Sequence, residues 1–164
     1  MLTKVSFTFG SHQVLEDIIK KNPDRQFKLM QASTHSNKLA LFDISGQDSI
    51  FKSPVVLTIL NASPNANMNG ILYYQSFQVN GDRQNLLNNS LDKIVEDAPS
   101  IANGVFLTSV ASKSEGATLV LLTSWNDFEG LTSWRESDSF KSLTNFTTLG
   151  SDNYYYDEIY RPTR

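Results

Sequence analysis

Apolar and polar residues alternate at the start of the chain in a pattern that predicts a strand, a helix and two more strands. Positions 3–9 alternate with a period of two, which is typical of a half-buried strand. Ser11 then provides a helix N-cap, and apolar residues recur at helical spacing until Pro23 ends the helix. Strand patterns return over 26–32 and 38–44.

The next segment has a mixed pattern and leads into a polar stretch. Residues 51–60 are largely apolar but contain Pro54, which permits either a short helix or a buried strand. Residues 61–70 contain four Asn together with Ser63, Pro64 and Gly70, which is typical of a loop or linker. The first part of the chain therefore has the order β-α-β-β, followed by one short element.

The same order of elements begins again after the polar stretch. Residues 71–79 form a predicted strand, and Asn80-Gly81 predicts a turn after it. A helix with apolar residues on one face is predicted from Asp82 onward. Residues 102–111 and 117–123 predict a hairpin that turns around 113–116.

Two further elements complete the second part of the chain. Asn126, with Glu129 three residues later, predicts the start of a helix, and a second short helix is predicted over 137–143. An aromatic strand is predicted over 154–160. The resulting order, β-α-β-β-α-β, is that of the ferredoxin-like fold.

These patterns predict an α+β protein of the ferredoxin-like, dimeric α/β-barrel class, with two halves in one chain. The halves are residues 1–62, a partial ferredoxin-like unit, and residues 68–164, a complete one. If the two sheets pack face to face, each buries the inner face of the other, and the chain forms an intramolecular pseudo-dimer. Since no second chain is then needed to cover the sheets, a monomer is favoured. A homodimer through an exposed edge strand, or one ferredoxin-like domain with an N-terminal extension, are the alternatives.

Composition excludes several classes of function. The 164 residues include no Cys and only two His, which removes disulfides, thiolate chemistry and multi-histidine metal sites. With 14 Lys and Arg against 17 Asp and Glu, the chain has no basic cluster for nucleic acid. No apolar run is long enough to span a membrane, and the N-terminus has no signal-peptide pattern, so a cytoplasmic protein is expected.

A motif in the second half is distinctive. Residues 121–128 end a strand at Trp125 and enter a helix, and residues 133–141 read S-W-R-E-S-D-S-F-K. This motif resembles the antibiotic biosynthesis monooxygenase superfamily, in particular the long haem-degrading monooxygenases of the Bacillus type. The resemblance covers nearly the whole chain, extends to staphylococcal proteins of similar length, and implies the ferredoxin-like fold.

The resemblance also implies site residues, several of which are replaced in this chain. Haem-degrading relatives use a Trp on the helix, a His ten residues later and an Asn on the first strand. Trp134 matches the Trp, whereas Thr144 stands at the position of the axial His. Tyr74 falls at the Asn position, with Gln75 one register away. Trp134, Gln75 and Phe140 are thereby assigned to binding of haem or another ligand.

Three functions follow as hypotheses from these residues. The first is a divergent haem-degrading monooxygenase or haem binder, and the second is an oxygenase or binder for another flat aromatic molecule. The third is a non-catalytic stress or regulatory protein that retains the fold. His12 and His35 have the sequence context of surface residues, and adjacent acids such as Asp157-Glu158 are interpreted as solvated charges.

Overall fold

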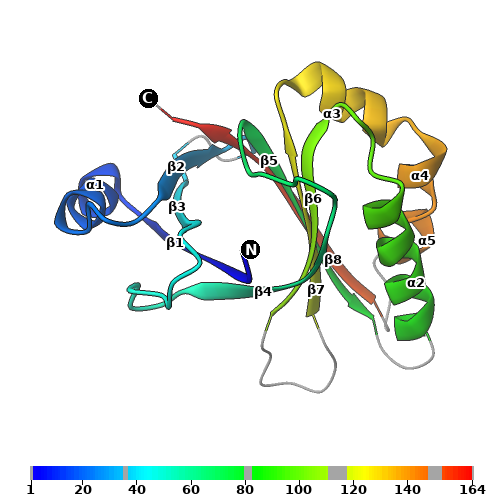
Figure 1. Cartoon of the computed structure of the whole chain (residues 1–164), viewed down its shortest axis with the longest axis horizontal. Coiled ribbons are helices and arrows are strands. Elements are labelled where there is room, and N and C mark those ends of the chain that lie inside the picture. The colour runs from blue at the N-terminus through cyan, green and yellow to red at the C-terminus, as the bar shows by residue number, and fades with distance from the viewer. Residues whose placement is uncertain (1, 35–36, 80–82, 111–117, 148–152, 164) are drawn as a thin grey trace.

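The chain folds into an eight-stranded closed barrel with helices packed on its outside (Figure 1). The structure is a computed structural model that describes residues 2–34, 37–79, 83–110, 118–147 and 153–163. The strands are β1 (Lys4–Gly10), β2 (Phe27–Ala32), β3 (Leu39–Asp43), β4 (Val55–Ala62), β5 (Ile71–Val79), β6 (Ala102–Val110), β7 (Thr118–Trp125) and β8 (Asn153–Pro162). The helices in the described part are α1 (His12–Lys21), α2 (Arg83–Glu96), α3 (Phe128–Arg135), α4 (Asp138–Lys141) and α5 (Thr144–Thr147).

The order of strands around the barrel is β1-β3-β2-β8-β5-β7-β6-β4, and all neighbours are antiparallel. The four strands of the first half are contiguous, as are the four of the second. In the first half, β1 lies between β4 and β3, and β2 lies beyond β3. In the second half, β5 lies between β8 and β7, and β6 lies beyond β7. The sets join where β2 pairs with β8 and β4 pairs with β6, so every strand has a partner on both sides.

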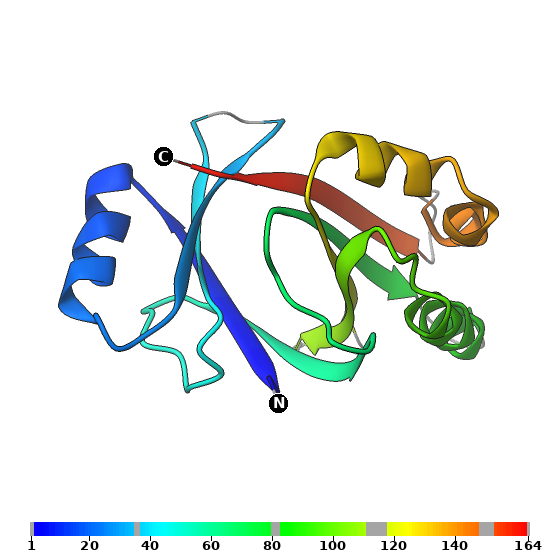
Figure 2. The same ribbon diagram turned by 45° about the horizontal axis from the view of Figure 1, so that its top comes forward.

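Side chains that alternate along the strands divide the core into an inner and an outer layer. Inside the barrel, all eight strands contribute to one cluster that includes Phe7, Phe42, Tyr74 and Tyr160. Outside, helices α2 to α5 cover the sheet of the second half, as Figures 1 and 2 show. Helix α1 covers the other side of the barrel, where Leu15 packs with residues of the first half.

The predicted elements of the first half are confirmed, and the ambiguous segment is resolved. Ser11 caps α1 by accepting a hydrogen bond from the backbone N–H of Val14 at 3.3 Å. Residues 51–60 do not form a helix, because Pro54 precedes a strand, β4, whose two edges pair with β1 and β6. The α+β class and the barrel are therefore established.

The polar stretch between the halves is packed against the barrel. Met68 is buried in the inner cluster. The Lys28 ammonium donates to the Met68 carbonyl, and the Ser124 hydroxyl donates to the Asn67 carbonyl, each at 2.5 Å. Residues 61 and 62 end strand β4, and residues 63–70 form a fixed loop against one end of the barrel.

One prediction for the second half needs correction, and the outcomes of the others differ. The N-cap of α3 is Asp127, which accepts from the Gly130 N–H at 2.8 Å, whereas Asn126 accepts from the Asn103 side chain. The short helix predicted over 137–143 is confirmed as α4, which Ser137 caps and which ends at Ser142, and a further helix that was not predicted, α5, follows it. The predicted turns at 80–81 and 113–116 lie outside the described residues.

Among the helices that the structure describes, none is long and apolar enough to cross a membrane.

Candidate functional site

The candidate site lies between the outer face of the second-half sheet and helices α3 and α4. Five residues define this helix–sheet site: Tyr73, Gln75, Trp134, Tyr155 and Asp157. Strand β5 contributes the first two, α3 contributes Trp134, and β8 contributes the last two. Alternation places Tyr73 and Gln75 on one face of β5, and the register pairs Gln75 with Asp157 across to β8.

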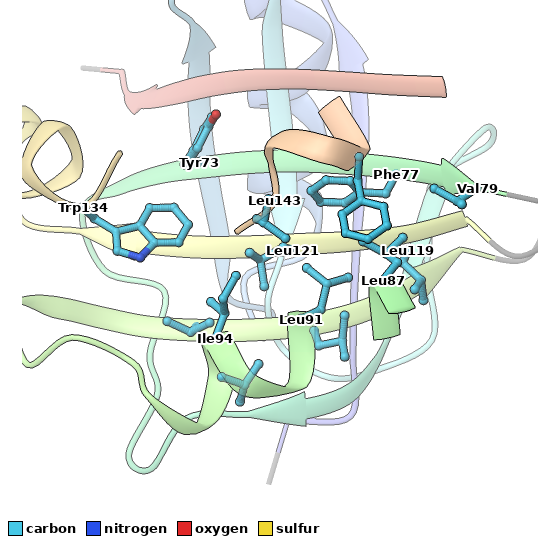
Figure 3. Close-up of a cluster of buried hydrophobic side chains, with 14 of the residues drawn as sticks. Tyr73, Phe77, Val79, Leu87, Leu91, Ile94, Leu119, Leu121, Trp134 and Leu143 are labelled. Atoms are coloured by element: carbon cyan, nitrogen blue, oxygen red, sulfur yellow. The ribbon is translucent and has the colours of Figure 1, made fainter. Parts of the chain in front are cut away.

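Aromatic rings enclose Trp134, which lies at one end of the outer cluster close to Tyr73 (Figure 3). Its ring centroid is 5.5 Å from that of Trp125, 5.1 Å from that of Phe140 and 6.4 Å from that of Tyr73. The Arg135 guanidinium lies 5.3 Å from the Tyr73 ring and 5.9 Å from the Phe140 ring. Trp134 is therefore a core residue, with a cation over two of the neighbouring rings.

The two tyrosines share one carboxylate. The Tyr73 hydroxyl donates to Asp157 Oδ2 at 2.7 Å, and the Tyr155 hydroxyl donates to the same oxygen at 2.9 Å. Burial raises the pKa of Tyr155 to about 12, and burial together with Tyr155 and Asp157 raises the pKa of Tyr73 above its ordinary value. Both phenols therefore stay neutral at physiological pH and serve as hydrogen-bond donors.

Two buried polar atoms at this site have no hydrogen-bond partner within the part of the chain that the structure describes. The Gln75 side chain donates through Nε2 to the Tyr155 hydroxyl at 3.1 Å, but its Oε1 has no donor. Trp134 Nε1 is also unpaired, although Trp125 Nε1 donates to the Thr123 hydroxyl at 2.8 Å. A buried unpaired donor or acceptor costs about 1–3 kcal/mol, so each of these atoms requires an explanation.

The structure brings together some of the predicted site residues and separates others. Trp134 and Phe140 are in ring contact, and Gln75 lies on the sheet face that the helices cover. Tyr74 points to the opposite face, into the barrel, and Thr144 is exposed at the start of α5. Of the two registers considered for the Asn position, Gln75 is the one that shares the outer face.

Sequence reasoning missed Tyr73, Tyr155 and Asp157. The interpretation of Asp157 and Glu158 as solvated charges is wrong. Asp157 accepts two phenol hydrogen bonds, and Glu158 is buried and accepts from the Thr34 hydroxyl at 2.5 Å. The available signal was the two-residue spacing of Tyr155 and Asp157, which places both on one face of a strand.

The site contains no imidazole among the residues that the structure describes. His12 is exposed on α1 at the far side of the barrel, 3.5 Å from Glu16, and His35 lies outside the described ranges. Within those ranges no cluster of three His, Asp or Glu side chains is suited to a metal ion.

The buried tyrosines predict a loss of stability at alkaline pH. Burial raises the pKa of both Tyr74 and Tyr155 to about 12, whereas unfolded tyrosine ionises near pH 10. The unfolded state therefore loses protons first, and stability that is complete below pH 10 falls as pH rises toward 12, by up to about 1.4 kcal/mol per pH unit for each tyrosine.

Urea unfolding midpoints measured between pH 9 and 11.5 test this prediction, alongside absorbance at 295 nm to follow phenolate formation. Lys28 acts in the opposite direction, because burial lowers its pKa, but it is one group against several tyrosines. A midpoint that stays constant up to pH 11.5 would contradict the prediction.

The fold and the site together define a class: an α+β protein whose single chain closes an eight-stranded barrel, with an aromatic, hydrogen-bonded site under helices on one half. No family model matches the sequence. Solved structures with the same fold over nearly the whole chain, however, support the resemblance seen in the sequence.

A major regulator of staphylococcal pathogenesis matches with a TM-score of 0.75 and 16% identity, over 98% of this chain and 99% of that one. An uncharacterised ferredoxin-fold protein of Listeria monocytogenes, related to antibiotic biosynthesis monooxygenases, has a TM-score of 0.72 and 14% identity, over 100% and 96%. A haem-degrading enzyme of the same organism has a TM-score of 0.70 and 15% identity, over 98% and 99%. At these identities the likeness establishes a shared fold.

Proposed function

We propose that this chain is a small-molecule-binding protein, whose helix–sheet site takes a flat aromatic ligand that carries both a hydroxyl and a carbonyl group. The observation that supports the proposal is the pair of unpaired buried atoms, the donor Trp134 Nε1 and the acceptor Gln75 Oε1. A ligand carbonyl would accept from the first and a ligand hydroxyl would donate to the second. If the ligand is a substrate, a divergent monooxygenase activity would depend on this same binding step.

The residues at the helix–sheet site do not fit haem. Haem iron in the monooxygenase relatives is held by an imidazole, and the corresponding residue here, Thr144, is exposed. The remaining candidates are the phenols of Tyr73 and Tyr155, but the shared carboxylate of Asp157 disfavours the phenolate that would bind iron.

We therefore expect no haem binding at the helix–sheet site. Titration of the purified protein with micromolar haemin should leave the Soret band of haemin at the position of the free compound. Because the Thr144 side chain is exposed, the Thr144→His variant should give the same result. A shifted Soret band that bleaches when a reductant is added would contradict this expectation and restore the haem hypothesis.

Aromatic ligand binding is tested with 2-hydroxy-9-fluorenone, which is neutral and carries a carbonyl and a hydroxyl too far apart to hydrogen-bond to each other. Its binding should shift the indole N–H resonance of Trp134 in a ¹⁵N-correlated NMR spectrum. The Gln75→Leu variant should weaken binding at least fivefold, since it removes the acceptor, while Gln13→Leu on the exposed face of α1 should not. Equal affinity for the two variants would reject the proposal.

A non-catalytic protein that retains the fold is a second candidate, and one observation favours it. Trp134 is 3% exposed and is packed against three aromatic rings, so the site has the density of a core. The same NMR titration separates the two candidates, because a purely structural Trp134 would show no ligand-dependent shift.

We further propose that residues 1–62 and 68–164 are two ferredoxin-like units that form an intramolecular pseudo-dimer. The identical strand order in the two sets supports this interpretation. Because each of the eight strands pairs with a neighbour on both sides, little unpaired strand edge remains for a second chain beyond the part of β8 that precedes its short pairing with β2, and we expect a monomer in solution. Size-exclusion chromatography with light scattering should give a mass of 18.4 kDa, and a doubled mass would contradict it.

A further inference from the structure

We propose that a second ligand site lies in the mouth of the barrel, and that it binds a small aromatic carboxylate. A cavity of about 300 Å³ extends from the inner cluster to the surface. Its inner wall includes Phe7, Tyr74 and Tyr160, and its rim includes Phe9 and Lys38. This barrel-mouth cavity is on the opposite face of the sheet from the helix–sheet site, so the proposal is independent of the proposed function.

Aromatic rings form the inner wall of the cavity. They are inclined to one another, so that their faces and edges are available for contact with a ligand. The Tyr74 ring centroid is 5.6 Å from that of Phe7, 6.3 Å from that of Tyr156 and 6.5 Å from that of Tyr160, with interplanar angles of 78°, 68° and 88°. Edge-to-face arrangements of this kind continue favourably onto another aromatic ring. The wall is therefore suited to a flat aromatic group.

The rings also differ in exposure along the cavity. Tyr74 is 7% exposed, whereas Phe9 at the rim is 43% exposed, an unusual position for a large apolar ring. A ligand seated in the cavity would cover Phe9 and remove its apolar surface from water. The exposed rim and the buried wall thus form one continuous apolar surface.

The positive charge at the rim of the cavity favours an anionic ligand. Among the described residues that line the cavity, Lys38 is the only charged one, and its ammonium lies 4.3 Å from the centroid of the Phe9 ring. Among the described carboxylates, none forms a salt bridge with Lys38. The nearest buried acid on the same face of β8, Glu158, accepts from the Thr34 hydroxyl and the Ile159 N–H and does not line the cavity.

The volume limits the size of the ligand. Ligand pockets range over roughly 300–1,000 Å³, and this cavity is at the lower end. It therefore suits a molecule of one or two fused rings with a single carboxylate that reaches Lys38, and it excludes a haem.

The test uses 2-naphthoate as the anionic probe and 2-naphthylmethylammonium as a cation of similar shape. We expect 2-naphthoate to bind with a Kd on the order of 0.1 mM by isothermal titration calorimetry. The cation should bind at least fivefold more weakly. The Lys38→Met variant should weaken naphthoate binding about fivefold, whereas Lys20→Met, an exposed lysine on α1, should leave it unchanged.

The same titration, followed by NMR, separates this site from the helix–sheet site. Naphthoate in the barrel mouth should leave both tryptophan indole resonances unchanged, because Trp125 and Trp134 belong to the outer cluster. The proposal is overturned by no binding at 5 mM naphthoate, by equal affinity for the two lysine variants, by preference for the cation, or by a shift of the Trp134 resonance. None of these outcomes alters the expected response of Trp134 to 2-hydroxy-9-fluorenone.

Discussion

Replacing Gly70 with alanine is expected to prevent the chain from folding, with a loss of at least about 4 kcal/mol of stability. Gly70 has φ +86°, a conformation that costs a residue with a Cβ about 1–2 kcal/mol. In addition, the new Cβ would overlap the backbone carbonyl of Trp125. Since Ile71 pairs with Trp125, relief of this overlap would separate the beginning of β5 from the end of β7. Soluble expression, far-UV circular dichroism and urea unfolding measure the effect.

Gly46→Ala is the matched control for this prediction. Gly46 has a similar φ of +81°, but a Cβ there would meet only the Leu2 side chain at 3.3 Å. Gly46→Ala therefore has the strain of a positive φ without the overlap. We expect it to lower the free energy of unfolding by about 1 kcal/mol. If the two variants unfolded at the same urea concentration, the result would contradict the expected overlap between a Cβ at position 70 and the Trp125 carbonyl of β7.

Local patterns in the sequence predict most of the elements, because each element has a strong period and clear ends. The strand 3–9 and the helix after Ser11 have both, and the structure confirms them as β1 and α1. The segment around Pro54 was ambiguous, because an apolar run of that length fits a helix or a strand equally well. Pairing with β1 and β6, which involves distant parts of the chain, decides in favour of β4.

The candidate site is harder to predict from the sequence, for reasons of register and distance. A slip of one residue along a strand reverses the face of every side chain, which is why Tyr74 and Gln75 could not be separated before the pairing of β5 with β8 was known. The contact between Tyr73 and Asp157 joins residues 84 positions apart, and no local pattern reports it. The motif around Trp134 identifies that residue alone, and its partners come from other strands.

Replacing Trp134 with alanine should destabilise the protein by about 3–5 kcal/mol, since it opens a cavity among Tyr73, Trp125 and Phe140. A decrease of this size is a large part of the stability of a domain, and urea unfolding at neutral pH would measure it. A variant that retains an aromatic ring at position 134 is more informative than Trp134→Ala. Trp134→Phe keeps much of the packing and removes the Nε1 donor, which has no partner.

Trp125→Phe is the matched control, because Trp125 is equally buried but donates from Nε1 to the Thr123 hydroxyl at 2.8 Å. Both variants remove a similar volume, but only Trp125→Phe removes a hydrogen bond, whereas Trp134→Phe removes the cost of an unpaired donor. We therefore expect Trp134→Phe to be more stable than Trp125→Phe by at least about 1 kcal/mol, and to lose affinity for 2-hydroxy-9-fluorenone. Equal destabilisation would mean that the Trp134 donor is paired in the protein without ligand, which would remove the principal support for an aromatic ligand at the helix–sheet site.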